Sequence, residues 1–325
     1  MQVVSVPREA APGEPRAAWM ARAQWGLMIG DLADGLRREA TEPLGADAWN
    51  AYVDAFDVEA LAGELAALKV PYVFVTVGRD SGFYAAPNAT YDAIVGATPS
   101  RGARRDLVGA LGDALAIRNI RMLVALTMAP PADDAAAVAA LQWSDGSNAA
   151  FRRHWERVVR DWSQRWGKRV AGWWFDGCAW PNAYRGAEPG FGSLAAAARE
   201  GNAEAAVAFN PGPANRLYSL TPHEDFTGGE VQDPEMAFPA FRRASEGSMD
   251  GARAHLVAVF RGVPETTFAW TRRVNAVGGA MTWRVDLGRD GRLPEDTRLA
   301  LAALSRLLTQ PMYEPPRRGP ARARE

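Results

Sequence analysis

Cysteine, histidine and lysine are scarce in this 325-residue sequence, and each scarcity excludes a class of chemistry. The single cysteine, Cys178, excludes an intrachain disulfide and a cysteine-rich zinc site. Three histidines are too few for the clustered imidazoles of a typical metal-dependent barrel hydrolase. The two lysines, Lys69 and Lys168, each precede a predicted strand, which is the wrong end for a Schiff-base aldolase. We therefore expect no metal and no organic cofactor.

The sequence also lacks an excess of charge and any long hydrophobic run. Lysine and arginine number 37 against 38 acidic residues, for a net charge of −1, so neither nucleic acid nor an anionic membrane is an expected partner. The longest apolar runs, such as Tyr72 to Val77, are too short to cross a bilayer. Residues 1–16 lack the apolar core of a secretory signal, so we expect a cytoplasmic location. The sequence leaves the oligomeric state open.

Short β-rich apolar runs alternate with helix-patterned stretches, which favours a parallel sheet covered by helices. The eight runs are residues 25–29, 72–77, 121–126, 170–175, 206–209, 225–229, 255–260 and 280–284. Eight strands predict a closed (β/α)₈ TIM barrel, because the glycine-rich phosphate turn of a doubly wound sheet is absent. We expect one catalytic barrel over residues 17–312, between a mobile segment (1–16) and a surface tail (313–325).

Apolar residues at helical spacing predict the helices that cover the sheet. One stripe runs from Val53 to Leu68, and the clearest consists of Phe151, Trp155, Val158, Val159, Trp162 and Trp166. Three prolines between Pro211 and Glu224 predict that the helix after the fifth strand is short or absent.

Barrel enzymes build their sites at the C-terminal ends of the strands, so the polar residues that end or follow each run are the candidates. These residues are Asp31, Arg79, Asp80, Asp176, Asn210, Glu230, Arg261, Arg284 and Asp286. They form a predicted ring of acids and arginines around the mouth of the barrel.

The fourth run ends in Trp173-Trp174-Phe175-Asp176-Gly177, and its alternation places Trp174 on the same side as Asp176. If Trp174 faces inward, its ring forms an apolar floor beneath the carboxylate. The simpler alternative is that Asp176 and Gly177 form a turn in which the aspartate accepts a backbone hydrogen bond. We expect at least one of Trp173 and Trp174 to pack in the hydrophobic core without a role in the site.

Several segments resemble the α-L-fucosidases of glycoside hydrolase family 29, unevenly but over most of the barrel. Residues 25–29 resemble the family's first strand, residues 76–83 with Tyr91 and Asp92 its second strand and the following loop, and Arg105-Asp106-Leu107-Val108 the helix that follows. The most specific match is Trp174-Phe175-Asp176-Gly177, in which the resemblance implies that Asp176 is the nucleophile of a retaining mechanism.

The sequence departs from this family where the sugar is recognised. The family binds fucose through a His-Trp pair after strand one and a His-His pair after strand two, and these places read Gly30-Asp31 and Arg79-Asp80 here. The resemblance therefore implies a fucosidase-like exo-glycoside hydrolase acting on a carbohydrate that need not be fucose. Arg79 could hold a sugar hydroxyl or a carboxylate.

A retaining glycosidase also needs a second carboxyl group, roughly 5 to 5.5 Å from the first, as acid and base. We predict Glu230 for this role, with Asp80, Glu224 and Asp225 as alternatives. The predicted substrate-binding residues are Asp31, Arg79, Asp80, Trp174, Asn210, Trp283 and Arg284. The rival hypothesis is a non-catalytic carbohydrate-binding barrel derived from a glycosidase.

Overall fold

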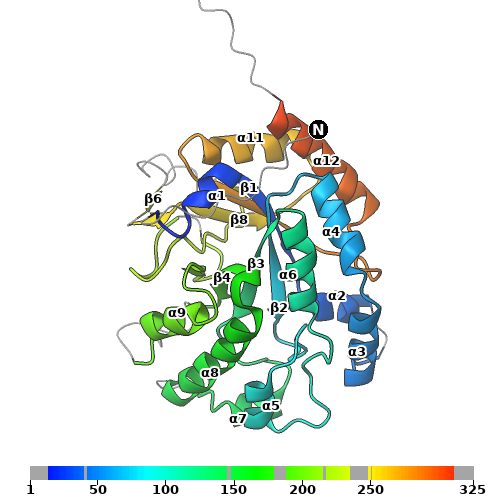
Figure 1. Ribbon diagram of the computed structural model, residues 1–325, viewed down its shortest axis with the longest axis vertical. Helices are drawn as coiled ribbons and strands as arrows, with labels where there is room; N and C mark the ends of the chain where they lie inside the picture. Colours follow the sequence, from blue (N-terminus) through cyan, green and yellow to red (C-terminus); the bar gives the residue numbers. More distant parts are fainter. Residues whose placement is uncertain are drawn as a thin grey trace, which may run out of the picture.

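The computed structural model describes residues 14–39, 42–144, 148–178, 188–214, 217–234, 248–249 and 251–310. Most of the predicted mobile segment (1–16) and the whole of the predicted surface tail (313–325) lie outside these residues. Within the described chain, strands and helices alternate along the sequence, as Figure 1 shows.

Seven parallel strands form the central sheet, in the order β5-β4-β3-β2-β1-β9-β8. They are β1 (Trp25–Ile29), β2 (Tyr72–Gly78), β3 (Arg121–Thr127), β4 (Val170–Asp176), β5 (Ala206–Phe209), β8 (His255–Val259) and β9 (Ala280–Val285). The short strands β6 (Ser248–Met249) and β7 (Ala252–Arg253) pair antiparallel outside this sheet. Seven of the eight predicted strands are thus confirmed, with ends that differ by at most one residue.

The prediction of a closed eight-stranded barrel is wrong at the sixth run, because residues 225–229 form no strand. The sheet curls into a half-barrel, and residues 225–231, here called the closing segment, lie between β5 and β8. Asp225 donates its N–H to the Val207 carbonyl of β5 at 2.8 Å, and Glu230 forms an isolated bridge with Val257 of β8. The closing segment therefore joins the two edge strands through isolated bridges and individual backbone hydrogen bonds rather than a continuous ladder.

Two glycines explain why this run is irregular. A Cβ on Gly228 would lie 2.5 Å from the Cα of Asn210, and one on Gly229 would lie 1.9 Å from the backbone oxygen of His255. Gly229 also has a φ of +64°, which interrupts the extended conformation of a strand. The glycines let the closing segment pass close to both neighbouring strands.

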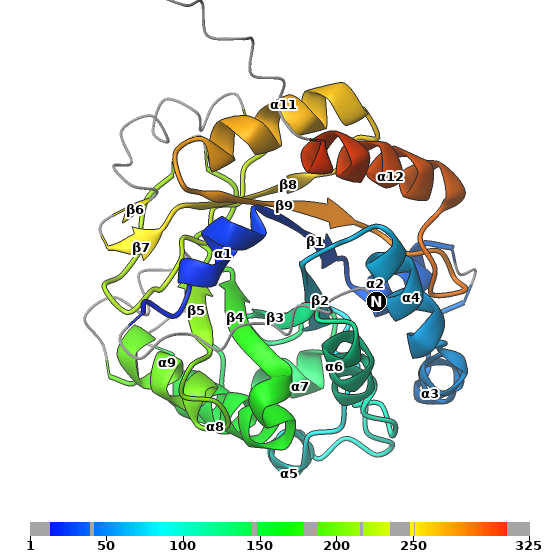
Figure 2. The same ribbon diagram turned by 45° about the horizontal axis from the view of Figure 1, so that its top comes forward.

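Helices cover the outer face of the curled sheet, with α8 and α9 beside β4 and β5, and α11 and α12 beside β8 and β9 (Figure 2). The helices are α1 (Ala18–Ala23), α2 (Leu32–Glu39), α3 (Ala46–Ala55), α4 (Val58–Ala67), α5 (Ala89–Val95), α6 (Leu107–Ile117), α7 (Ala135–Ala140), α8 (Ala149–Trp166), α9 (Phe191–Arg199), α11 (Pro264–Asn275) and α12 (Glu295–Thr309), with a 3₁₀ turn η1 (Gly167–Arg169). None of them is long and apolar enough to cross a membrane, among the residues described.

The helix patterns were predicted with mixed success. All six apolar residues of the stripe in α8 are buried, as predicted. The stripe from Val53 to Leu68 belongs to two helices, because the helix ends at Ala55 and Asp57 caps a new one by accepting the N–H of Ala60. In the described stretches between β5 and the closing segment there is no helix, as the prolines predicted.

Strand alternation divides the apolar residues into two cores. Trp173 and Phe175 point outward and pack in the layer between the sheet and the helices. Trp174 points inward and belongs to the core that fills the barrel. Helix α1 covers one end of this inner core, where the Trp19 ring meets the Tyr72 ring edge-on at 5.5 Å. The polar residues lie at the opposite end of the inner core, at the C-terminal ends of the strands.

Candidate functional site

Asp176 is the last residue of β4 and its carboxylate is firmly held. The chain turns at Gly177, whose φ is +75°, and the Gly177 N–H donates to Asp176 Oδ1 at 2.8 Å. The backbone oxygen of Asp176 accepts from the Met128 N–H at 2.8 Å. The turn that the sequence offered as a simple alternative is therefore present, and it fixes the carboxylate at the mouth of the barrel.

Asn210, which follows β5, links Asp176 to Glu230. Its fully buried side chain donates Nδ2–H to Asp176 Oδ1 at 2.7 Å and to Glu230 Oε2 at 2.8 Å. Two acceptors on one amide nitrogen also determine the orientation of the amide, since its oxygen cannot donate. Because both oxygens bond to one nitrogen, Asp176 Oδ1 and Glu230 Oε2 are at most about 5.5 Å apart, an upper bound that is compatible with the short carboxyl separation of retaining glycosidases.

Each carboxylate is also paired with an arginine. Arg79 Nη2 lies 3.3 Å from Asp176 Oδ2, and Arg284 Nη1 lies 3.2 Å from Glu230 Oε1. The arginine side chains are 38% and 37% exposed, whereas the carboxylates are 17% and 15% exposed. The arginines therefore face the solvent side of a pair of largely buried carboxylates, and their charges offset the electrostatic cost of that burial.

Asp31, which follows β1, completes a pocket at the mouth of the barrel. Its Oδ1 accepts the Asp34 N–H at 2.8 Å at the start of α2, and burial raises the pKa of this carboxyl group to about 7. The pocket is lined by Met28, Gly30, Asp31, Thr76, Arg79, Ala125, Leu126, Thr127, Trp174, Asp176 and Arg284. Asp31 thus combines a raised pKa with a place in the same pocket as Asp176.

Trp174 lines this pocket from inside the barrel, on the side of β4 that it shares with Asp176, as the strand alternation predicted. Its indole Nε1–H donates to the Gly228 carbonyl at 2.8 Å, so the ring also ties β4 to the closing segment. Of the predicted residues, Asp31, Arg79, Trp174, Asp176 and Arg284 line one pocket, while Asn210 and Glu230 bond to its members.

Two predicted substrate-binding residues lie elsewhere. Trp283 belongs to the outer core, where its Nε1–H donates to Thr271 Oγ1 of α11 at 3.1 Å. Its neighbour Arg284 faces the pocket. Adjacent residues of a strand point to opposite sides, so Trp283 and Arg284 cannot both face the pocket. Asp80 does not line the pocket; its backbone oxygen accepts from the Asp133 N–H at 2.9 Å.

The alternative acids bind backbone groups rather than the pocket. Glu224 accepts from the N–H groups of Phe209 at 2.9 Å and Leu220 at 2.7 Å, and burial raises its pKa to about 7. Asp225 accepts from the Val207 N–H at 2.8 Å and pairs with Arg199. Both acids thus stabilise the loop after β5, whereas Glu230 shares the Asn210 donor with Asp176.

Sequence reasoning missed the pocket residues that are neither charged nor aromatic: Met28, Gly30, Thr76, Ala125, Leu126 and Thr127. Strand alternation could have found Thr127, which pairs in register with Asp176, and Met28, which pairs with Arg284. Within the described ranges, no group of three or more His, Cys, Asp or Glu side chains has the arrangement of a metal site.

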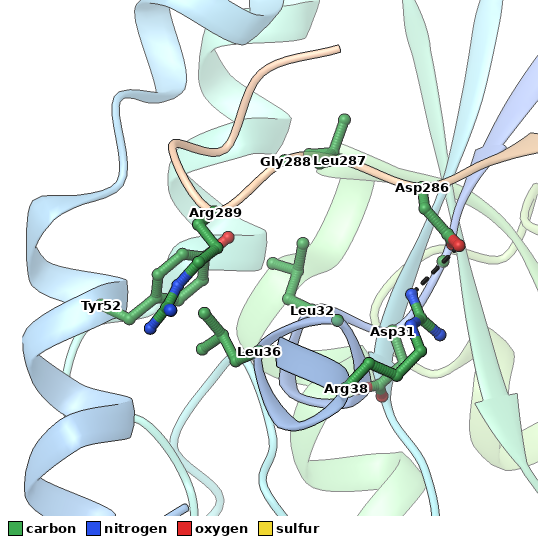
Figure 3. A pocket seen from close by; sticks show the side chains of 11 residues that line it. Asp31, Leu32, Leu36, Arg38, Tyr52, Asp286, Leu287, Gly288 and Arg289 are labelled. Carbon is green, nitrogen blue, oxygen red and sulfur yellow. Dashed lines mark hydrogen bonds and ion pairs between the residues drawn. The ribbon is translucent and has the colours of Figure 1, made fainter. Parts of the chain in front are cut away.

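A second pocket lies on the other side of Asp31 and shares Gly30 and Asp31 with the first (Figure 3). Leu32 and Leu36 of α2 lie at its centre, and the Tyr52 ring of α3 forms one side. Opposite α2, the loop after β9 carries Asp286, whose Oδ2 lies 3.0 Å from Arg38 Nη2. This pocket is a rim feature with paired charges, next to the site that holds the two carboxylates.

Comparisons with known proteins reveal a shared fold without close sequence similarity. No protein family and no curated protein matches the sequence. Among solved structures, the endo-fucoidan hydrolase P5AFcnA from glycoside hydrolase family 107 matches with a TM-score of 0.70 and 17% identity, over 91% of this chain and 94% of that one. The α-L-fucosidase AlfC from Lactobacillus casei, in complex with α-L-fucose, matches with a TM-score of 0.63 and 16% identity, over 90% and 98% of the two chains.

A third structure, α-L-fucosidase isoenzyme 1 from Paenibacillus thiaminolyticus, matches with a TM-score of 0.63 and 17% identity. It is covered over 75% of its length, and this chain over 91%. The chain therefore has a fucosidase-like glycoside hydrolase fold, as the sequence resemblance predicted.

Proposed function

We propose that this protein is a retaining, fucosidase-like exo-glycoside hydrolase in which Asp176 is the nucleophile and Glu230 the acid and base. The observation that carries the proposal is the sharing of one Asn210 nitrogen by the two carboxylates, which keeps Asp176 Oδ1 and Glu230 Oε2 at most about 5.5 Å apart. The shared fold with fucosidases and an endo-fucoidan hydrolase supports the reaction class.

In the first step, Asp176 Oδ2 attacks the anomeric carbon while the bond to the leaving oxygen breaks. Oδ1 is held by the N–H groups of Gly177 and Asn210, so Oδ2 is the oxygen that faces the sugar. Glu230 in its acid form gives its proton to the leaving oxygen, and an alcohol departs. The product is a glycosyl ester on Asp176.

In the second step, the Glu230 carboxylate takes a proton from water as the water attacks the anomeric carbon. The ester bond to Asp176 breaks, the aspartate regains its charge, and the sugar leaves with its original anomeric configuration. Both steps use groups that the chain itself supplies at the ends of β4 and the closing segment.

The sugar need not be fucose, because Asp31 and Arg79 line the pocket, and the sequence resemblance aligns them with positions where the family carries histidines. We expect slow hydrolysis of aryl α-L-fucosides for this reason. Rapid hydrolysis would mean that Asp31 and Arg79 recognise fucose in place of the histidines.

The test uses aryl glycosides of varied sugar and anomer, with product stereochemistry followed by NMR. We expect Asp176→Ala to lower kcat/KM at least about 10⁴-fold with an unchanged circular dichroism spectrum. Glu230→Ala should slow substrates with poor leaving groups far more than those with good ones, since only the former need protonation.

Azide, a small external nucleophile, separates the two roles. It should give a glycosyl azide of inverted configuration with Asp176→Ala and one of retained configuration with Glu230→Ala. Asp286→Asn is the matched control, because this rim carboxylate is 60% exposed and lies outside the catalytic pocket. Full activity of Asp176→Ala would refute the nucleophile, and sugar binding by the wild type without any turnover would favour the carbohydrate-binding alternative.

A further inference from the structure

The nucleophile's attacking oxygen is engaged by an arginine. Asp176 Oδ2 pairs with Arg79 Nη2, while Arg79 Nε is buried and, among the described residues, has no hydrogen-bond partner. The N–H groups of Nε and Nη2 point to the same side of the guanidinium and form a fork that matches a carboxylate. Asp176 uses one prong of this fork, so a ligand carboxylate that takes both prongs competes well for Arg79.

The charges of the site favour an anionic ligand. Catalysis by the proposed route needs Asp176 ionised and Glu230 protonated. With Arg79 and Arg284 always charged, these two arginines and the two carboxyl groups then sum to one positive charge, and the raised pKa of Asp31 weakens the negative charge that would offset it. A positive charge beside an oxocarbenium-like transition state is unfavourable unless the substrate supplies a negative one.

We propose that the sugar accepted by this site is a hexuronic acid, whose ring carboxylate binds Arg79 and thereby releases Asp176 Oδ2 for attack. This inference rests on the proposed glycosidase function and names its substrate class. In a hexuronic acid the carboxylate is on C5, which only the ring oxygen separates from the anomeric carbon. A group held by Arg79 therefore lies beside the carbon that Asp176 attacks. A neutral sugar has no carboxylate that could replace Asp176 as the partner of Arg79, so Arg79 remains paired with the nucleophile.

The first experiment uses the wild-type protein and matched pairs of substrates. These are 4-nitrophenyl glycuronides of gluco and galacto configuration, in both anomers, with the corresponding neutral hexosides and a 2-O-sulfated hexoside. We expect kcat/KM for one glycuronide to exceed that of its neutral partner at least about 100-fold, the scale of a charge-assisted, two-pronged hydrogen bond. Hydrolysis of the sulfated hexoside in preference to all glycuronides would overturn the carboxylate assignment.

The second experiment removes the arginine. Arg79→Met should lower kcat/KM for the preferred glycuronide about 100-fold and change that of the neutral hexoside much less, so that selectivity disappears. Arg38→Met is the matched control, because Arg38 lies in the neighbouring pocket of Figure 3, paired with Asp286 and 59% exposed. It should retain selectivity. Retention of selectivity by Arg79→Met would refute the proposal.

Failure of this inference can be distinguished from failure of the proposed function. Equal hydrolysis of neutral hexosides and glycuronides would refute the hexuronic acid and leave the glycosidase mechanism intact. Absence of turnover with every substrate would refute the mechanism. In that case, isothermal titration calorimetry tests which class of sugar the site binds. Free hexuronic acids should bind the wild-type protein at least about 10-fold more tightly than the parent hexoses. Equal or weaker binding would overturn the proposal.

Discussion

Asn210 is the residue that organises the site, because it is the direct link between two carboxylates that would otherwise repel each other. Its Nδ2 group donates to both, and its Oδ1 is buried with no hydrogen-bond partner among the residues described. A neutral donor between two acids lowers their repulsion without adding a charge. An aspartate at this position would place three carboxyl groups together.

We predict that Asn210→Ala lowers kcat about 100-fold and leaves KM within about threefold, because the amide positions both reacting groups and contributes little to ground-state binding. Steady-state kinetics on the preferred aryl glycoside checks this. Asn88→Ala is the control, since Asn88 is equally buried but caps α5 and donates to the Val158 carbonyl far from the pocket. It should lose stability and keep kcat. An unchanged kcat in Asn210→Ala would contradict the role of Asn210.

The closing segment, residues 225–231, is the element on which the geometry of the site depends. It carries Glu230, accepts the Trp174 indole N–H at Gly228, and accepts the Val257 N–H at Gly229. Thr227 donates its hydroxyl to the His255 carbonyl at 2.7 Å. Backbone bonds on either side of Glu230, from the Val257 N–H to the Gly229 carbonyl and from the Val231 N–H to the Val257 carbonyl, act together with the side-chain bonds and close glycine contacts to determine where Glu230 lies.

The glycine contacts can be tested with a matched pair of substitutions. Gly229 and Gly212 both have positive φ, +64° and +95°, so alanine costs each of them about 1 kcal/mol in backbone strain. Only at Gly229 does the new Cβ meet a backbone atom, His255 O at 1.9 Å, whereas Gly212 has open space. We expect Gly229→Ala to lower the free energy of unfolding by at least about 2 kcal/mol more than Gly212→Ala, measured in urea. Equal losses would show that the segment can move aside.

At the scale of the whole molecule, the barrel has an apolar interior with a buried polar chain through it. Tyr72 Oη and Thr282 Oγ1 lie 2.9 Å apart, and Thr282 Oγ1 lies 2.7 Å from His255 Nε2. His255 Nδ1 lies 3.1 Å from the Thr227 carbonyl, so the neutral ring can donate there and accept from Thr282. Burial among Phe74 and Phe226 lowers the pKa of His255 to about 4.

The stability of the protein should depend on pH through these buried groups. Between pH 6.5 and 4 the unfolded chain binds a proton at His255 that the folded chain does not, so this contribution to the unfolding free energy falls as pH falls. The contribution of His255 to the unfolding free energy is fully present above pH 6.5. Glu224 acts in the opposite sense, because its raised pKa makes the folded state bind more protons, and stability falls as pH rises from 4.5 to 7.

Urea denaturation at pH 4.5, 5.5 and 6.5 checks the predicted direction of the stability change for His255 and for Glu224. Relative to His255→Asn, the wild type should lose up to about 1.4 kcal/mol per pH unit on acidification. Relative to Glu224→Gln, it should lose stability as pH rises. Parallel curves for the wild type and either variant would contradict the corresponding shift.

The sequence predicted most of the fold and part of the site, and the reasons differ for each residue. Trp174 and Asp176 could be placed on one face because strand alternation is a local property of β4. The same rule would have excluded Trp283 once Arg284 was accepted. Residues 225–229 were predicted to be a strand because their composition resembles one, but close approach to Asn210 and His255 depends on neighbours distant in sequence.

The sequence by itself determined which residues reach the C-terminal ends of the strands, since apolar runs and their alternation are encoded locally. Only the tertiary structure decided which of these residues meet. Asp176 and Asn210 are 34 positions apart, and Glu230 and Arg284 are 54 apart. Their contacts depend on how far the sheet curls and where the closing segment passes, which are set by packing of the whole barrel. For the same reason, the pairing of Arg79 with Asp176 could be found only in the folded chain.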